Sequence, residues 1–419
     1  MQELDKVCVP RVVRVKQNLI NAPLLDDIPS KVRKEIENTS FLSKIRRGDK
    51  VAVGVGSRGI DKLEEVVRAV VNLLKEIGAK PFIVPAMGSH GGATAEGQRQ
   101  VLAAYGITEE KLGVPIISCM EVVEVGRTPE GVPIYFDKMS YQSDAVIAIN
   151  RIKPHTEFSG EVESGILKML TIGFGKHRGA STLHRYGAQN LPQLILQAAR
   201  LVIEKAPIAL GIALLEDGYG QLSEIKAMDP EDIEEEEKKL LRKQKDLMPR
   251  IPFPQIDLLL VDEMGKNISG AGLDTNIIGR KKPANTEIRY IVVRDLTRES
   301  HGNAAGIGLV DIITERIFKK IDFYATYINC LTSRTIETAK IPLVVKNDET
   351  AIKIALFLID KDPKEVKMVR IKNTSKLEQL EISEGLVGEA SDRLEIISDF
   401  FCYRFDAYGN LLEHGLELD

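Results

Sequence analysis

Short apolar segments of strand length alternate with amphipathic segments of helix length between residues 50 and 220, and this alternation strongly constrains the fold. Residues 51–56 (VAVGVG) and 143–150 (SDAVIAIN) are apolar runs of the kind found in strands buried on both faces. Residues 63–77 place apolar side chains on one helical face, and Gly78 is suited to end that helix. Strands that alternate with helices pair in parallel, so we expect a parallel sheet flanked by helices.

The chain has 419 residues, which is too long for one ordinary core and favours two domains. The charged run at residues 234–245 (EEEEKKLLRKQK) predicts a solvated helix, and prolines 249, 252 and 254 cannot continue it. We therefore place a boundary there and predict an N-terminal α/β domain over residues 1–250 and a C-terminal α/β domain over residues 251–419. Further predicted elements are strands at 81–85, 208–215, 255–262 and 287–293, and helices near 98–105, 192–205, 302–319 and 349–359.

The fold class expected is two α/β domains with mostly parallel sheets flanked by helices and an active site in the interdomain cleft. The net charge of -4, with 57 basic and 61 acidic residues, does not favour a nucleic-acid partner. No apolar run reaches the ~18 residues that span a bilayer, so no membrane partner is expected. Four separated cysteines without a CxxC motif fit a reducing cytoplasm. Nothing in the sequence indicates the oligomeric state.

Histidine is scarce, and four of the six histidines lie in one stretch of the first predicted domain: His90, His155, His177 and His184. A single histidine beside glycine or basic residues is usually an ordinary surface residue. Loops that follow the strands of an open α/β sheet, however, are where such folds bind ligands. The clustering in these loops favours a functional role.

Residues 54–59 (GVGSRG) follow a strand and match the GxGxxG pattern of dinucleotide-binding loops. A nicotinamide cofactor is therefore an alternative, although the next strand, PFIVPAMG, ends without the acidic residue that would hold the ribose. Arg58 is the more informative residue, because a guanidinium at the edge of a sheet can bind a carboxylate or phosphate with two hydrogen bonds.

Residues 87–92 (MGSHGG) surround His90 with small residues, so a ligand could approach the backbone while the imidazole acts as acid or base. Residues 151–184 hold three histidines and five basic side chains directly after a buried strand. The histidines lack the spacing of a protein-only metal site, so a metal here would need ligands from elsewhere, such as a cofactor.

At these residues the sequence resembles the nickel-pincer-nucleotide lactate racemase family. Arg58 in GSRG matches the family's substrate-carboxylate arginine, and His90 and His155 match its two catalytic histidines. The family also has a Ser-Gly-x-x-Lys segment, matched here by residues 164–168, and a metal-binding histidine sixteen residues later, matched by His184.

Some residues depart from the family pattern. The distance from His155 to Lys168 is a few residues longer, and an alignment on residues 158–160 would place Glu163 where the lysine belongs. Lys168 is preferred because it restores both Ser-Gly and the spacing to His184. His177 is an additional candidate metal ligand. In the second domain, Lys266 is the candidate substrate-binding residue, while Asp274 and Asn276 have no clear counterpart.

The resemblance implies a racemase or epimerase of a 2-hydroxy acid, with reversible hydride transfer and with His90 and His155 as acid and base. It implies a nickel-pincer nucleotide (pyridinium-3,5-bisthiocarboxylic acid mononucleotide nickel) joined to Lys168, with His184 on the metal and with Ser164, Gly165 and Gly56 against the cofactor. Expected partners are the hydroxy acid and the host's cofactor-biosynthesis enzymes. An NAD-dependent dehydrogenase and a non-catalytic two-lobed carboxylate-binding protein remain the alternatives.

Overall fold

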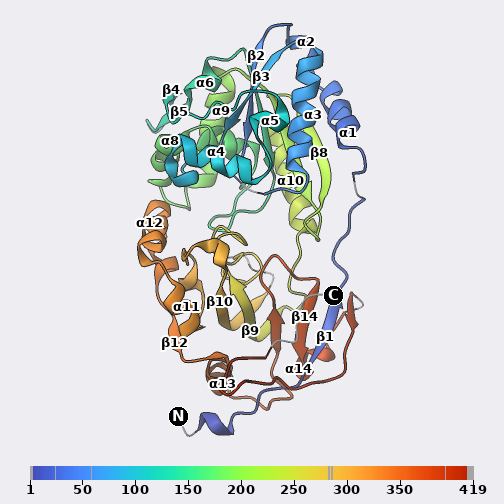
Figure 1. Cartoon of the computed structure of the whole chain (residues 1–419), viewed down its shortest axis with the longest axis vertical. Coiled ribbons are helices and arrows are strands. Elements are labelled where there is room, and N and C mark those ends of the chain that lie inside the picture. The colour runs from blue at the N-terminus through green and yellow to red at the C-terminus, as the bar shows by residue number, and fades with distance from the viewer. Residues whose placement is uncertain are drawn as a thin grey trace. The chain divides into compact units, whose positions relative to one another are not determined.

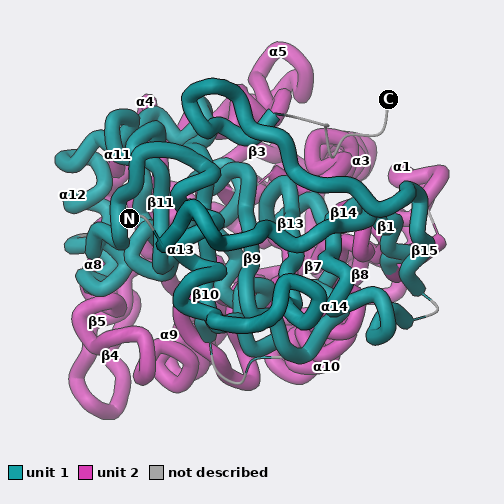
Figure 2. Tube along the Cα trace, turned by 90° about the horizontal axis from the view of Figure 1, so that it is seen from below, with its two compact units in different colours: residues 1–19, 249–419 teal, residues 20–248 magenta. Residues whose placement is uncertain are grey.

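The computed structural model describes residues 3–23, 25–57, 59–281, 284, 286–391 and 393–412. The chain divides into two compact units (Figure 2). Unit 2 is one continuous segment, Ile20–Met248, whereas unit 1 combines Met1–Leu19 with Pro249–Asp419. Among the described residues, no helix is both long and apolar enough to cross a membrane.

Unit 2 contains a five-stranded sheet of order β3-β2-β6-β7-β8. Figure 1 labels β2, β3 and β8 of this sheet. Neighbouring strands from β3 to β7 are parallel, and β8 is antiparallel to β7. The strands are β2 (Lys50–Val55), β3 (Lys80–Pro85), β6 (Ala145–Arg151), β7 (Ile208–Glu216) and β8 (Leu222–Met228), and a separate hairpin consists of β4 (Val122–Arg127) and β5 (Pro133–Asp137). Successive side chains of β2 enter two different cores, one on each face of the sheet, as its uninterrupted apolar sequence predicts.

Helices cover both faces of this sheet, with α1, α3 and α4 on one face and α7, α9 and α10 on the other. The helices of unit 2 are α1 (Ile28–Glu37), α2 (Phe41–Lys44), α3 (Leu63–Glu76), α4 (Ala95–Ala104), α5 (Glu109–Leu112), α6 (Lys138–Tyr141), α7 (Ile166–Lys168), α8 (Lys176–His184), α9 (Leu191–Lys205) and α10 (Ile233–Leu247), with a π-helical turn at Met169–Gly173 and a 3₁₀ turn at Gly91–Ala93. Gly78 follows α3 with a φ of 84°, as expected for a glycine after a helix end.

Helix α10 contains the charged run that was expected to be fully solvated. One of its faces is instead buried and includes the carboxylate of Glu237 and the amide of Gln244. Charge composition alone did not reveal this face, because a buried glutamate and an exposed one look the same in sequence.

Unit 1 contains an eight-stranded sheet of order β12-β11-β10-β9-β13-β14-β1-β15. Strands β12 to β13 of this order are parallel, and the remaining pairings are antiparallel. The strands are β1 (Val12–Gln17), β9 (Gln255–Met264), β10 (Glu287–Leu296), β11 (Ile312–Thr314), β12 (Leu343–Val345), β13 (Met368–Ile371), β14 (Gln379–Ser383) and β15 (Leu394–Ile396). The helices are α11 (Glu315–Lys320), α12 (Phe323–Ser333), α13 (Asp348–Ile359) and α14 (Glu384–Val387), with 3₁₀ turns at Leu4–Lys6, Arg298–Ser300, Ile307–Leu309 and Ile336–Ala339. The expected α/β class, with mixed and parallel sheets flanked by helices, is therefore confirmed.

Strand β1 lies between β14 and β15, so the start of the chain belongs to the sheet of unit 1. The predicted first domain ran from residue 1 to residue 250 and did not separate this strand. Its pairing partners are hundreds of residues away, and a single sequence carries no local signal for such a pairing.

The helix predicted near residues 302–319 is wrong over its first half. Gly302 and Gly306 have φ angles of 78° and 100°, which end regular structure rather than continue a helix. Residues 312–314 then form β11, and the helix starts only at Glu315.

A row of alternating charges crosses five neighbouring strands of unit 1. Arg294 on β10 pairs with Asp262 on β9 at 2.7 Å, and Arg370 on β13 pairs with both oxygens of Asp262 at 2.8 and 2.9 Å. Glu381 on β14 then accepts hydrogen bonds from Arg370 at 2.9 Å and from Arg14 on β1 at 3.3 Å. We call these five residues the charge row.

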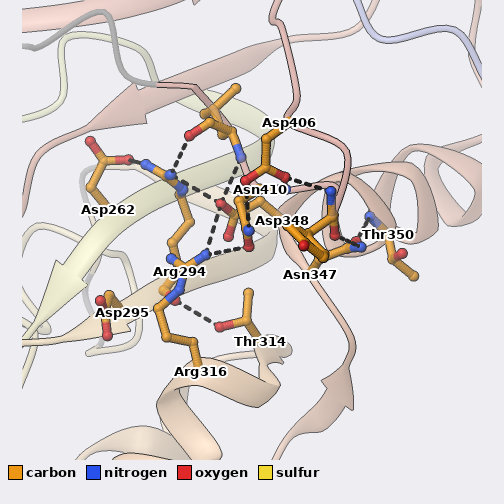
Figure 3. A network of polar contacts seen from close by, with 12 residues as sticks. Asp262, Arg294, Asp295, Thr314, Arg316, Asn347, Asp348, Thr350, Asp406 and Asn410 are labelled. Atoms are coloured by element: carbon orange, nitrogen blue, oxygen red, sulfur yellow. Dashed lines mark hydrogen bonds and ion pairs between the residues drawn. The ribbon is translucent and has the colours of Figure 1, made fainter.

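The charge row is covered by the first turn of α13 and by the end of the chain. Arg294 also donates to Asp348, the first residue of α13, at 3.0 Å, and Figure 3 shows it between Asp262 and Asp348. Tyr403 donates its hydroxyl hydrogen to Glu381 at 2.9 Å. Because every member has an oppositely charged partner, the row can be buried without leaving an isolated charge.

Candidate active site

The candidate site lies at the carboxyl ends of the central parallel strands of unit 2. Val55, the last residue of β2, is in register with Pro85 at the end of β3 and with Ile149 near the end of β6. The loops that follow these three strands therefore leave the same edge of the sheet. Strand β3 lies on one side of β2 and β6 on the other, which is the arrangement where open α/β sheets bind ligands.

His90 lies in the loop after β3, and its imidazole is exposed. Its Nδ1 shares a hydrogen bond with the hydroxyl of Ser57, from the loop after β2. The backbone of this loop is held by the buried Gln98 of α4, whose amide donates to the carbonyl oxygens of Gly88 at 2.9 Å and of His90 at 3.3 Å. A hydroxyl can either donate or accept, so Ser57 allows both neutral tautomers of His90.

Lys176 supports the same loop from behind. Its side chain is fully buried, donates to the carbonyl oxygen of Pro85, and lies 3.5 Å from the amide oxygen of Gln98. Burial lowers the pKa of Lys176, and the carboxylate of Asp137, at 3.4 Å, opposes that shift. Gln98, Lys176 and Asp137 therefore form a polar frame under the His90 loop. Sequence reasoning missed all three roles, because Lys176 was counted only as one more basic side chain.

His155 follows β6 and is partly buried. Its Nδ1 accepts a hydrogen bond from the backbone N–H of Glu157 at 3.1 Å, so a neutral ring carries its proton on Nε2. The ring stacks on Phe158, with centroids 4.0 Å apart and planes 17° apart. These contacts fix the plane of the imidazole and leave Nε2 as the nitrogen able to donate a proton.

The buried carboxylate of Glu163 stabilises the backbone of the His155 loop. It accepts from the backbone N–H of His155 at 2.7 Å and pairs with Lys245 of α10 at 2.7 Å. A structural role thus accounts for Glu163, which the alternative alignment would have placed at the anchor position. Lys168, the preferred anchor, is only partly buried, and its ammonium lies 6.0 Å from the ring centroid of Phe158.

Gly165 and Gly56 both pack so closely against neighbouring side chains that a Cβ would have little room. A Cβ on Gly165 would lie 2.4 Å from the carboxyl carbon of Glu237, and one on Gly56 would lie 3.0 Å from the side-chain oxygen of Asn150. Asn150 also donates to the carbonyl oxygen of Gly165 at 2.8 Å, so it links the end of β6 to the start of α7. The backbone of Ser164 pairs with that of Lys153 as an isolated antiparallel bridge.

Glu237 lies beneath the first turn of α7. Its Oε2 accepts from the N–H of Leu167 at 3.0 Å. Burial raises the pKa of Glu237 to about 7, and the backbone N–H groups of Leu167 and Ile166 oppose the shift. A titratable group therefore lies directly under the helix that carries Lys168.

His184 is the last residue of α8, and its Nδ1 lies 2.6 Å from the carbonyl oxygen of Ala180. A carbonyl oxygen only accepts, so Nδ1 carries the proton and Nε2 keeps its lone pair. Burial lowers the pKa of His184, and the positive charge of Lys168 lowers it further. A neutral imidazole with Nδ1–H bonded to a backbone carbonyl is the usual form of a metal-binding histidine.

The structure does not test three of the predicted site residues. Arg58 lies outside the described residues. Lys266 belongs to unit 1, where its ammonium donates to the carbonyl oxygen of Gly270 and, at 3.0 Å, to Asn329. His177 is exposed on α8. Its role as an additional metal ligand and the substrate role of Lys266 stay predictions.

Within the described part of the chain, no group of three or more His, Cys, Asp or Glu side chains could hold a metal ion. A metal bound at His184 would therefore take its other ligands from a cofactor. The residues present fit such a group, because a single imidazole nitrogen is available near a lysine that can anchor it.

The GxGxxG match is explained by packing. A Cβ on Gly54 would lie 2.1 Å from the ring of Phe174, so this glycine makes room for a core side chain rather than for a pyrophosphate. Helix α3 begins only at Leu63, beyond the glycine pattern. These features speak against the nicotinamide alternative.

Unit 2 is thus an α/β unit with a candidate active site, in which His90 and His155 lie in the loops after β3 and β6 and Lys168 and His184 belong to the same unit. Residues 8–189 match the family model of the lactate racemase N-terminal domain. Among solved structures, the lactate racemase apoprotein from Thermoanaerobacterium thermosaccharolyticum matches with a TM-score of 0.52 and 13% sequence identity, over 87% of this chain and 99% of that chain. No curated protein matches significantly.

The match over residues 8–189 confirms, for that part of the chain, the resemblance expected from the sequence, and it supports a racemase-type activity. The solved structure shows that the fold is shared.

Proposed function

We propose that this chain is a racemase or epimerase of a 2-hydroxy acid that uses a nickel-pincer nucleotide joined to Lys168, with His184 as the protein's metal ligand. The observation that carries the proposal is the state of His184. Its Nδ1–H is tied to Ala180, its pKa is lowered, and the charge of Lys168 contributes to that shift. Gly56, Ser164 and Gly165 would lie against the cofactor.

When bound, the cofactor supplies a hydride acceptor, so the α-carbon can pass through a planar keto acid and regain its hydrogen on either face. The chain's own residues must bind the carboxylate and move the hydroxyl proton. We assign the carboxylate to Arg58, and Lys266 is the second candidate to bind it. A guanidinium with two parallel donors would fix the orientation of the acid before reaction.

His90 and His155 would handle the proton. The hydrogen bond from the N–H of Glu157 holds the plane of the His155 ring. As the acid, His155 would be the imidazolium, which gives its Nε2 proton to the substrate oxygen and returns to the neutral ring. Ser57 allows His90 either tautomer, so His90 can accept a proton. A racemase needs one protonated and one unprotonated group at the start of each turnover, with the roles exchanged in the reverse direction.

The test is to produce the protein together with the cofactor-making enzymes and to measure intact mass and nickel content. We expect an adduct that maps to Lys168 and about one nickel per chain. Lys168→Ala should abolish the adduct, whereas Lys205→Ala, at an exposed lysine on α9, should not. His184→Ala should keep the adduct but lose nickel, because the anchor and the metal ligand are separate residues.

Unmodified, nickel-free protein from cells that demonstrably make the cofactor would refute the proposal. The assignment of acid and base is tested separately on loaded enzyme by following racemisation of lactate and of longer hydroxy acids. His90→Ala and His155→Ala should each lower kcat about 10²-fold or more. Full turnover in both variants would refute the two-histidine mechanism.

A further inference from the structure

The outer face of α8 forms a groove that the proposed reaction does not use. Its volume is about 680 Å³, and its lining includes Tyr135, His177, Arg178, Ser181, Arg185 and Tyr186. Neither Lys168 nor His184 lines it. The groove is formed by unit 2 alone, from α8, the residues that follow it and the start of β5.

The groove carries positive charge without a matching carboxylate. Among the described residues, neither Arg178 nor Arg185 forms an ion pair, and no carboxylate lines the groove. The guanidinium of Arg178 instead lies over the ring of Tyr135, with its carbon 4.3 Å from the ring centroid. This cation–π contact orients the guanidinium and leaves its N–H groups to a ligand.

Helical spacing brings the polar groups of the groove together. Arg178 and Arg185 are seven residues apart, which is two turns or about 10 Å along the axis, and Ser181 lies on the same stripe between them. An arginine side chain is long enough for both guanidiniums to reach a group held at Ser181. His177 lies one turn before Ser181 and adds a ring N–H.

We propose that this groove binds a phosphate monoester of a small molecule. Two guanidiniums, a hydroxyl and an imidazole supply more donors than one carboxylate can accept, and they match a dianion with three terminal oxygens. Tyr135 and the half-exposed Tyr186 provide apolar walls for the carbon skeleton attached to that phosphate. The volume suits a ligand of metabolite size.

The experiment measures binding of inorganic phosphate, glycerol 3-phosphate, glycerol and malonate to the full chain by calorimetry. Glycerol 3-phosphate should bind at least as tightly as phosphate, and glycerol and malonate should bind much more weakly. Removing both guanidiniums in Arg178→Gln/Arg185→Gln should weaken binding about tenfold or more, because charge-assisted hydrogen bonds are lost. Arg242→Gln, at an exposed arginine on α10 outside the groove, should bind like the wild type.

Lys168→Ala should also bind like the wild type, which separates this groove from the cofactor site. The proposal is overturned if malonate binds as well as glycerol 3-phosphate, if phosphate binds but its ester does not, or if the double variant and Arg242→Gln behave alike. Loss of binding in Lys168→Ala with retention in the double variant would place the anion elsewhere and equally overturn it. Circular dichroism of the double variant checks that it is folded.

Discussion

Individual polar side chains beneath the candidate site fix the backbone of the two loops that carry its histidines. Gln98 and Lys176 fix the backbone of the His90 loop, and Glu163 fixes that of the His155 loop. None of these residues needs to meet the substrate. They place two imidazoles whose hydrogen-bonding states differ, which is what a reaction that moves a proton between two groups requires.

Glu237 leads to a prediction about stability. Its pKa in the folded protein is about 7, above the value of 4.5 for an unperturbed glutamate, so the folded state holds this proton over a range in which the unfolded state has released it. Its contribution to stability is therefore fully present at low pH and is lost as pH rises from about 4.5 through 7. Urea unfolding should show this loss, at most about 3 kcal/mol, relative to Glu237→Gln, whose side chain does not titrate.

The matched control is Glu235→Gln on the exposed face of the same helix. It should keep the pH dependence of the wild type. If wild type and Glu237→Gln lose stability in parallel between pH 5 and pH 8, the carboxyl of Glu237 does not titrate as its burial indicates.

At the same scale, the sequence indicated the residues that we propose for the reaction but not the residues that support their loops. His90, His155, Lys168 and His184 stand out because histidine is scarce and because their order resembles a known family. A buried Lys176 or Glu163, in contrast, looks like any surface charge until its partners are known. Those partners belong to other helices, strands and loops, and no periodicity in the sequence predicts which residues they are.

At the scale of elements, the parallel core strands and long amphipathic helices were predictable because each signals itself within about fifteen residues. Strands β2, β3, β6 and β9 and helices α3, α9 and α13 lie close to their predicted positions. The region near residues 302–319 was not predictable, since β11 is three residues long and glycine turns precede it. The antiparallel edge β14-β1-β15 depends on long-range pairing and was missed entirely.

The charge row gives a prediction for the sheet of unit 1. Asp262→Asn removes the carboxylate that two buried arginines share, which leaves Arg294 and Arg370 without a common counter-ion. We expect a loss of about 3 to 5 kcal/mol in the free energy of unfolding of this unit, measured by hydrogen exchange of the amides of β9 and β10.

Asp295→Asn is the control, because Asp295 pairs with a partly exposed lysine, Lys320, the last residue of α11 in the same unit. An exposed pair contributes at most about 1 kcal/mol. If both variants lost the same free energy of unfolding, burial of the charge row would not explain its contribution to stability.

At the scale of the whole molecule, unit 2 is an insertion between the first strand of unit 1 and the rest of it. Deleting residues 1–19 should therefore destabilise the distant C-terminal unit. It would remove the strand between β14 and β15 and, with Arg14, one of the hydrogen-bond donors to Glu381, and would leave unit 2 intact. Amides of β14 should then exchange faster, while those of β2 and β6 should be unchanged.

Deleting only residues 1–3, which precede the 3₁₀ turn Leu4–Lys6, should leave exchange in both units as in the wild type. Faster exchange in β2 and β6 in the longer deletion, with β14 unaffected, would show that the N-terminal strand supports unit 2 instead.

This insertion also sets an order of events while the protein is being made. Arg14 and Glu381, neighbours in the finished sheet, are 367 residues apart in the chain. At ribosomal speeds of roughly 5 to 20 residues per second, β1 leaves the ribosome tens of seconds before β14 exists. All of residues 20–248 are synthesised in that interval, so unit 2, which contains the candidate active site, can fold first. Strand β1 of unit 1 can pair only after β14 has been translated.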